Sequence, residues 1–141
     1  MDEKNTVAQL KERLNKDRKD IEAALALGNL YYDKGDAGQS ILYYRIALDI
    51  NPALPGVRTD LGTMYWHNDD VGLAEQAFRE AIVQDSGFGN AYVNLGLLLH
   101  RAKGNVMEAR AVWQQLLTVN PSHAAAGRAR ELLQETAALV H

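Results

Sequence analysis

The sequence repeats itself every 34 residues, and this repeat constrains the fold more than any other feature. A Leu-Gly pair stands at Leu27-Gly28 and returns at 34-residue intervals as Leu61-Gly62 and Leu95-Gly96. Each pair is followed by a small residue and then a large aromatic one: Ser40 and Tyr44, Ala74 and Phe78, and, one residue late, Ala109 and Trp113. A period of this length is typical of helical hairpins that stack one on the next. The sequence therefore predicts an all-α superhelix, also called an α-α solenoid.

The repeat divides the chain into three hairpin units with one further helix at each end. The predicted boundaries are 1–20 for an N-terminal flanking helix, 21–54, 55–88 and 89–123 for the hairpins, and 124–141 for a C-terminal capping helix, all in one domain. The third unit is one residue longer than the others, and we expect the extra residue in its turn, 102–105. Asn51-Pro52 and Asn120-Pro121 end the first and third units, because proline cannot continue a helix.

Short polar side chains mark where the helices begin. Thr6 is expected to cap the first helix and Asp20 the second, since their side-chain oxygens can accept from free backbone N–H groups. Asp36 and Asp70 stand at the same place before the second helices of their hairpins, and Asn105 with Glu108 has the spacing of a capping box. The last helix is expected over 122–140, with a narrow apolar stripe made by Ala126, Ala129, Leu133, Ala137 and Val140.

Composition and charge exclude several classes of function. The chain is 47% apolar and carries a net charge of −3, and acidic residues outnumber basic ones between residues 21 and 121. Such a field repels a phosphate backbone, so no nucleic-acid partner is predicted. No apolar run approaches the roughly 20 residues of a membrane helix. We therefore expect a soluble domain with no membrane insertion by this chain, although removal of an N-terminal anchor would leave the same sequence.

Cysteine is absent, so disulfides and thiolate chemistry are excluded while cytoplasm and periplasm both stay open. No catalytic constellation stands out either. The glycines of Gly87-Phe88-Gly89 lie between two helices, not between a strand and a helix, so they do not indicate a phosphate loop. His67 and His100 lack the short spacing of preorganised metal ligands. The prediction is a protein that is not an enzyme, without a cofactor, a metal site or catalytic residues.

The repeat resembles the tetratricopeptide repeat, whose 34-residue pattern combines an aromatic residue, Leu-Gly, Tyr, a small residue, a second aromatic and Pro. Three Leu-Gly pairs in phase carry the resemblance, and with the flanking helices it covers nearly the whole chain. Ala24 and Arg58 replace the first aromatic, and Leu99 replaces the Tyr of the third unit. That unit is also similar to bacterial tetratricopeptide domains that follow a membrane anchor, some of them in cytochrome c maturation.

What the resemblance implies is a right-handed superhelix in which the first helix of each hairpin lines a concave groove. In this family the groove binds a peptide or a helix of a partner protein. The groove positions carried onto this chain are Leu25, Asn29, Tyr32 and Asp33 in the first unit, Thr59, Thr63, Trp66 and His67 in the second, and Val93, Asn94, Leu97, His100 and Arg101 in the third.

Tyr32, Trp66 and His100 recur at 34-residue spacing and predict an aromatic strip that anchors a partner. The alternative for Trp66 is that its ring packs between neighbouring repeats. Some family members hold the acidic carboxyl terminus of a chaperone with lysine and arginine. In this chain Leu25, Asn90 and Asn94 stand where such cations are needed, which disfavours a chaperone adaptor.

The predicted function is therefore a non-catalytic protein-interaction module that acts as an adaptor or assembly scaffold, as a monomer or weak homo-oligomer. The alternative is a structural module that associates with itself through its terminal helices or its convex face. A short groove of three hairpins predicts modest affinity that a second contact would reinforce.

Overall fold

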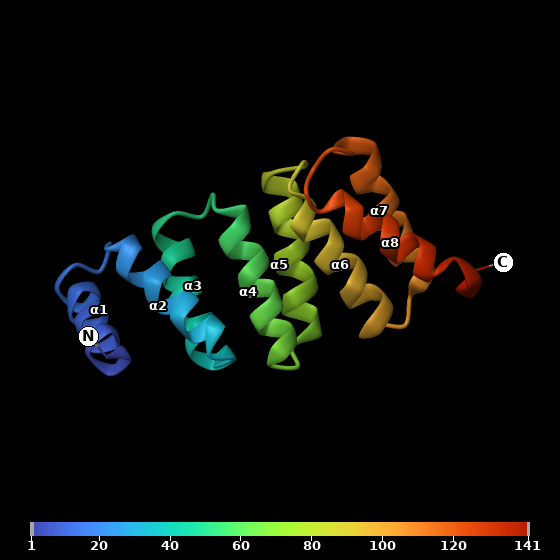
Figure 1. The fold of residues 1–141 in the computed structure, drawn as a ribbon. Helices are drawn as coiled ribbons and strands as arrows, with labels where there is room; N and C mark the ends of the chain where they lie inside the picture. Colours follow the sequence, from blue (N-terminus) through green and yellow to red (C-terminus); the bar gives the residue numbers. More distant parts are fainter. Residues whose placement is uncertain (1, 141) are drawn as a thin grey trace.

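The computed structural model describes residues 2–140, and the regular structure in this range is entirely helical. Figure 1 shows the helices in a row that follows the chain order, with the first and last helices at opposite ends. The helices are α1 (Glu3–Lys16), α2 (Ile21–Asp33), α3 (Ala37–Ile50), α4 (Pro55–His67), α5 (Val71–Gln84), α6 (Gly89–Arg101), α7 (Val106–Val119) and α8 (Ala126–Glu135), followed by a 3-10 turn, η1 (Ala137–Leu139). The predicted all-α superhelix is confirmed.

Three antiparallel hairpins form the body of the molecule. The closest packing joins α2 to α3, α4 to α5 and α6 to α7, and each hairpin also contacts the next one. The first helices form a layer of their own, because α4 touches α6 and α6 touches α8. The hairpins fall within the predicted units, whereas the boundaries between units lie in the connections and stay a prediction.

The glycine of each Leu-Gly pair lets an aromatic ring of the second helix approach the first helix. A Cβ on Gly28 would lie 2.5 Å from Cδ1 of Tyr44, and a Cβ on Gly62 would lie 2.6 Å from Cε1 of Phe78. Gly96 faces the indole of Trp113 even more closely. The three rings are almost fully buried. The repeat is thus one glycine–aromatic contact used three times, with the partner displaced by one residue in the third hairpin.

The turns account for that displacement. The turns of the first two hairpins span residues 34–36 and 68–70, whereas the third spans 102–105 and is one residue longer. Gly104 takes the left-handed conformation in it, with φ of 66°. Because glycine has no Cβ, it adopts this conformation without the strain that another residue would meet there.

Most predicted caps are confirmed, and one is wrong. The side chains of Asp20, Asp36, Asp70 and Asn105 each accept a hydrogen bond from the backbone N–H three residues on. The first helix does not begin at Thr6. It begins at Glu3, because the carboxylate of Asp2 accepts from the N–H of Asn5 at 2.9 Å and caps the helix one turn earlier.

The last helix is shorter than predicted. α8 ends at Glu135, and the buried Thr136 hydroxyl donates to the carbonyl of Leu132 at 2.7 Å. Arg110 of α7 donates to the Leu133 carbonyl at 2.6 Å and to the Thr136 hydroxyl at 2.7 Å, which satisfies the groups at the helix end. The buried face consists of Ala126, Ala129, Leu132 and Thr136, so the predicted stripe through Leu133, Ala137 and Val140 is shifted by one position from the observed one.

Candidate functional site

Two adjoining hollows lie on the face formed by the first helices of the hairpins, and together we call them the groove. The first, the Trp66 hollow, has a volume of about 420 Å³ and is lined by Thr63, Trp66, His67, Asp69 and Asn94. The second, the Asp60 hollow, has a volume of about 320 Å³ and is lined by Gly56, Thr59, Asp60, Phe88, Asn90, Val93, Asn94, Ala125 and Arg128. Asn94 of α6 belongs to both, so the hollows meet at its side chain.

The Trp66 hollow combines an apolar wall with polar side chains. The Trp66 ring is partly buried and rests on the core between the second and third hairpins, while the rest of it lines the hollow. His67 and Asp69 are exposed at its edge, and Asp69 has a φ of 60° in the turn after α4. The Trp66 ring therefore packs between repeats and also faces the groove, and its role as an anchor for a partner stays a prediction.

The Asp60 hollow lies between α4, α6 and α8. Thr59 and Val93, two of the predicted groove positions, line this hollow but are only 3% and 7% exposed. The Thr59 hydroxyl donates to the carbonyl of Pro55 at 2.8 Å, so it is already satisfied within α4. A partner reaches these two residues only after it enters the hollow.

Asp60 is one of three charged residues of this site that are absent from the predicted groove positions, with Asp69 and Arg128. Its carboxylate is half-buried, and within residues 2–140 no side chain or backbone group forms a hydrogen bond or ion pair with it. Burial raises the pKa of this carboxyl group from 3.8 to about 6. Burial first, and the Asp60 charge second, raise the pKa of Tyr32 and of Tyr44, which places the carboxylate near the first hairpin as well.

A signal for Asp60 was present in the repeat. Asp60 and Asn94 are 34 residues apart and directly precede the Leu-Gly pairs of their units, so they occupy the same position of the repeat. The predicted groove positions include Asn94 but not Asp60. The two side chains line the same hollow in the folded chain.

Arg128 supplies the positive charge of the Asp60 hollow. Its guanidinium Nη1 lies 3.2 Å from Glu131 and 3.4 Å from Glu135, both on α8. Arg128 is therefore paired along its own helix, while Asp60 on the opposite wall has no such partner.

The remaining predicted groove residues do not line either hollow. The Tyr32 ring packs against the core of the first hairpin, 6.4 Å from the Tyr44 ring, and Asn29 accepts a hydrogen bond from the Tyr44 hydroxyl. Leu97 packs against the core of the third hairpin. Thus Tyr32, Trp66 and His100 do not share one hollow. The other residues that lie outside the hollows are the half-buried Leu25 and His100 and the exposed Asp33 and Arg101.

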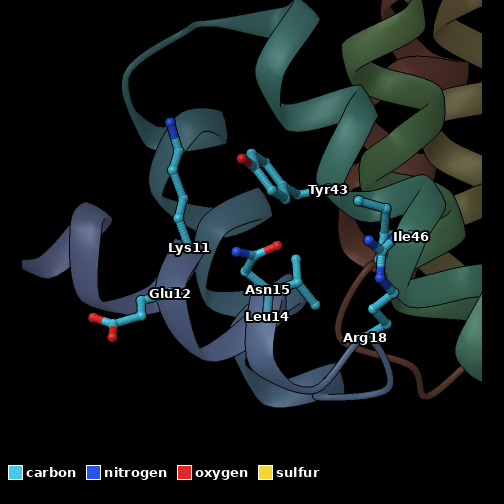
Figure 2. Close-up of a pocket in the computed structure, with 7 residues that line it drawn as sticks. All are labelled: Lys11, Glu12, Leu14, Asn15, Arg18, Tyr43 and Ile46. Atoms are coloured by element: carbon cyan, nitrogen blue, oxygen red, sulfur yellow. The ribbon is translucent and has the colours of Figure 1, made fainter.

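Other hollows lie on the side of the second helices. One of about 570 Å³ separates α1 from α3, where Figure 2 shows Tyr43 and Ile46 of α3 across from Leu14 and Asn15 of α1. Another follows α5, where Arg58 is bonded to Glu80 at 2.7 Å. The ionic groups of this second hollow are paired with one another, in contrast to Asp60.

The described residues contain neither a metal-binding cluster nor a membrane-spanning helix. Among residues 2–140, no group of three His, Asp or Glu side chains is arranged to hold a metal ion. In the same range, no helix combines the length and apolar character needed to cross a membrane.

Comparison with known proteins supports the helical-repeat class that this geometry defines. Residues 25–88 match a family model described as tetratricopeptide repeat. No curated protein matches the sequence. Solved structures of tetratricopeptide-repeat domains superpose on 82% and 84% of the chain, so the fold is that of a tetratricopeptide-repeat superhelix.

Three solved structures illustrate the likeness. The crystal structure of MamA superposes with a TM-score of 0.79 at 22% identity, over 94% of this chain and 77% of that chain. The Arabidopsis OM64 tetratricopeptide-repeat domain has a TM-score of 0.69 at 21% identity, over 82% and 94% of the two chains. The first such domain of Spaghetti (RPAP3), solved with the HSP90 peptide SRMEEVD, has a TM-score of 0.66 at 24% identity, over 84% and 96%.

Proposed function

We propose that this chain is a tetratricopeptide-repeat interaction module that binds an extended segment of a partner protein along the groove. In this role it acts as an adaptor or assembly scaffold and not as an enzyme. The observation that carries the proposal is the pair of adjoining hollows on the first-helix face, one of which has the Trp66 ring as a wall. Aromatic side chains that are already held by the core make effective anchors, because little conformational freedom is lost on binding.

Two of the similar structures support this proposal by what they contain. The first domain of Spaghetti (RPAP3) was solved with an HSP90 peptide, and the second domain of human RPAP3 was solved with the HSP70 peptide SGPTIEEVD. Both peptides are ligands of those two proteins. For this chain, the likeness favours a peptide as the class of ligand and the groove as its binding surface.

Self-association is less well supported. Ala126, Ala129 and Leu132 of α8 are buried and Leu133 is partly buried against the core, so this helix leaves little apolar surface for a second copy. The large apolar side chains that are exposed are spread over α3, α5, α7 and η1, among them Leu42, Val83 and Met107. A membrane tether before residue 1, and a role in cytochrome c maturation, stay predictions from the resemblance of the third unit.

The experiment is a selection of random dodecapeptides on the immobilised protein, followed by affinity measurements with the selected peptides. Trp66→Ala and Asn94→Ala should each weaken binding at least about tenfold, a loss typical of interface anchors. Val83→Ala is the control, since Val83 is 85% exposed on α5 and lies away from the groove. Selected peptides that bind both groove variants as tightly as the wild type would contradict the proposal.

A further inference from the structure

We propose that the groove selects a partner segment carrying a lysine or arginine side chain, and that this cationic group seats in the Asp60 hollow. This inference rests on the proposed function and adds the chemistry of the ligand to it. The occupant is a segment of another protein, held by its main chain and its neighbouring side chains along the Trp66 hollow.

The first support is the state of the Asp60 carboxylate. It lines the hollow, it is half-buried, and none of the described residues bonds to it. A carboxylate withdrawn from water without a partner is unfavourable, and a guanidinium or ammonium group supplies the charge-assisted hydrogen bond that it lacks. The rise of its pKa to about 6 on burial agrees with the lack of a partner for the ionised carboxylate. A bound cation would supply that partner.

The second support is the shape and polarity of the surrounding wall. The side chains of Asn90 and Asn94 line the same hollow beside Asp60. Amide oxygens accept hydrogen bonds from the remaining N–H groups of a guanidinium or ammonium ion. A volume of about 320 Å³ leaves room for the end of a long side chain.

The third support is the charge along the first-helix layer. Helix α2 contains no lysine or arginine; of its two exposed carboxylates, Glu22 lies 3.5 Å from Arg13 of α1, and Asp33 stands at the end of the helix. The only arginine of α4, Arg58, is bonded to Glu80 and to the carbonyl of Pro52 on the other side of the hairpin. Neither α2 nor α4 therefore offers a free lysine or arginine to the first-helix face, and complementary charge favours a basic segment.

Arg128 is the group that opposes this proposal, because it lines the same hollow. Its charge is offset by Glu131 and Glu135, whose carboxylates lie within 3.4 Å of it. An acidic segment would have to bind Arg128 in competition with these two residues and would face Asp60 without a partner. The balance of charges therefore favours a cation.

The test uses a library of N-acetylated heptapeptide amides with every residue at each position, bound to the immobilised full chain. The wild type should enrich lysine or arginine at one position. Asp60→Asn should abolish that enrichment and weaken the best peptide about tenfold or more, as expected for loss of one charge-assisted bond. Arg128→Gln should leave binding unchanged or tighten it. Asp49→Asn is the matched control, since Asp49 is exposed on α3 outside both hollows.

A change on the peptide side keeps the test independent of how well Asp60→Asn folds. Replacing the enriched lysine of the peptide by norleucine should weaken binding to the wild-type protein as much as Asp60→Asn does. The same replacement should weaken binding to the Arg128→Gln protein by a similar factor. Enrichment of acidic or apolar residues, or a larger loss with Arg128→Gln than with Asp60→Asn, would overturn the inference and leave the groove standing. If no peptide is selected at all, the proposed function fails together with the inference.

Discussion

At the scale of single residues, Asp60 links the stability of the protein to pH. Its carboxyl pKa is about 6 in the folded protein against 3.8 for an ordinary aspartate, so the folded chain holds a proton between these values that the unfolded chain has lost. Because this pKa is higher in the folded state than in the unfolded state, the contribution of Asp60 to the unfolding free energy falls as the pH rises from about 4 to 6. Above pH 6 the ionised carboxylate costs stability.

Asp60→Asn should therefore stabilise the protein at pH 7. We expect a gain of about 1–2 kcal/mol, which discounts the shift for the solvent that still reaches the group. The gain should shrink as the pH falls to 4.5, where the wild-type carboxyl is mostly protonated. Urea unfolding of the wild type and Asp60→Asn at pH 4.5 and 7 measures the difference in their unfolding free energies. The contributions of the other acidic groups are the same in both proteins and cancel from this difference. A difference that does not change with pH would show that Asp60 is well solvated.

Trp66 has two roles that a pair of substitutions can separate. The ring is partly buried against the core and also lines a hollow, so Trp66→Ala should lower the unfolding free energy by about 2 kcal/mol and abolish peptide binding. Trp66→Leu should keep most of the stability because it fills part of the space, yet lose the aromatic anchor. Urea unfolding and peptide affinity report the two effects. Unchanged stability in Trp66→Ala would mean that the ring contributes nothing to the core.

At the scale of elements, the glycine–aromatic contact sets the distance between the two helices of each hairpin. Gly62→Ala places a Cβ within 2.6 Å of the Phe78 ring, so the helices must separate or the ring must move. We expect a loss of about 2 kcal/mol or more. Gly72→Ala is the matched control on α5, where nothing lies within 4 Å of the new Cβ.

Gly72→Ala should be neutral or stabilising by up to about 1 kcal/mol, because alanine favours a helix over glycine. The midpoints of thermal unfolding of the two variants should therefore move in opposite directions from that of the wild type. Equal losses in both would indicate that backbone freedom, and not the Phe78 contact, explains the glycine of the repeat.

Arg110 joins the last helix to the third hairpin. Its guanidinium donates to the carbonyl of Leu133 and to Thr136 at the end of α8. Arg110→Met keeps the length of the side chain and removes these bonds, so hydrogen exchange should quicken in residues 132–139 by about tenfold. Amides of α4 should keep their wild-type exchange rates. Uniform acceleration along the whole chain would show that the end of α8 does not open by itself.

These elements show what a sequence makes predictable and what it does not. The repeat could be found because the same Gly–aromatic contact is encoded three times at a fixed period. The caps at Asp20 and Asn105 could be found because a cap needs only residues three positions apart. The end of α8 could not, since it depends on Arg110, a residue 26 positions away from Thr136.

The candidate site was predicted less completely than the fold. Thr63, Trp66, His67 and Asn94 lie around one hollow, because the repeat fixes which side of a helix they occupy, and their role in peptide binding stays a prediction. The depth of a side chain depends on how neighbouring hairpins pack, and this is not encoded locally. For that reason Thr59 and Val93 prove to be buried, and Asp60 was passed over.

At the scale of the whole molecule, the hairpins stack in a row, and their first helices α2, α4 and α6, continued by α8, supply one face. A ligand that follows this face touches several repeats at once, so small contributions from each hairpin add up along the row. A groove that spans so few hairpins offers a limited contact area. Affinity in the micromolar range is the expectation for a single peptide.

The most direct test of the groove is an NMR titration of the isotope-labelled chain with a peptide chosen by the selection described above. Backbone amide shifts should concentrate around Thr63, Trp66 and Asn94, with the indole N–H of Trp66 among the largest changes. The chemical shifts of amides in α3, α5 and α7 that face away from the groove should not change. Shifts confined to those second helices, with the Trp66 indole unmoved, would contradict the groove as the binding surface.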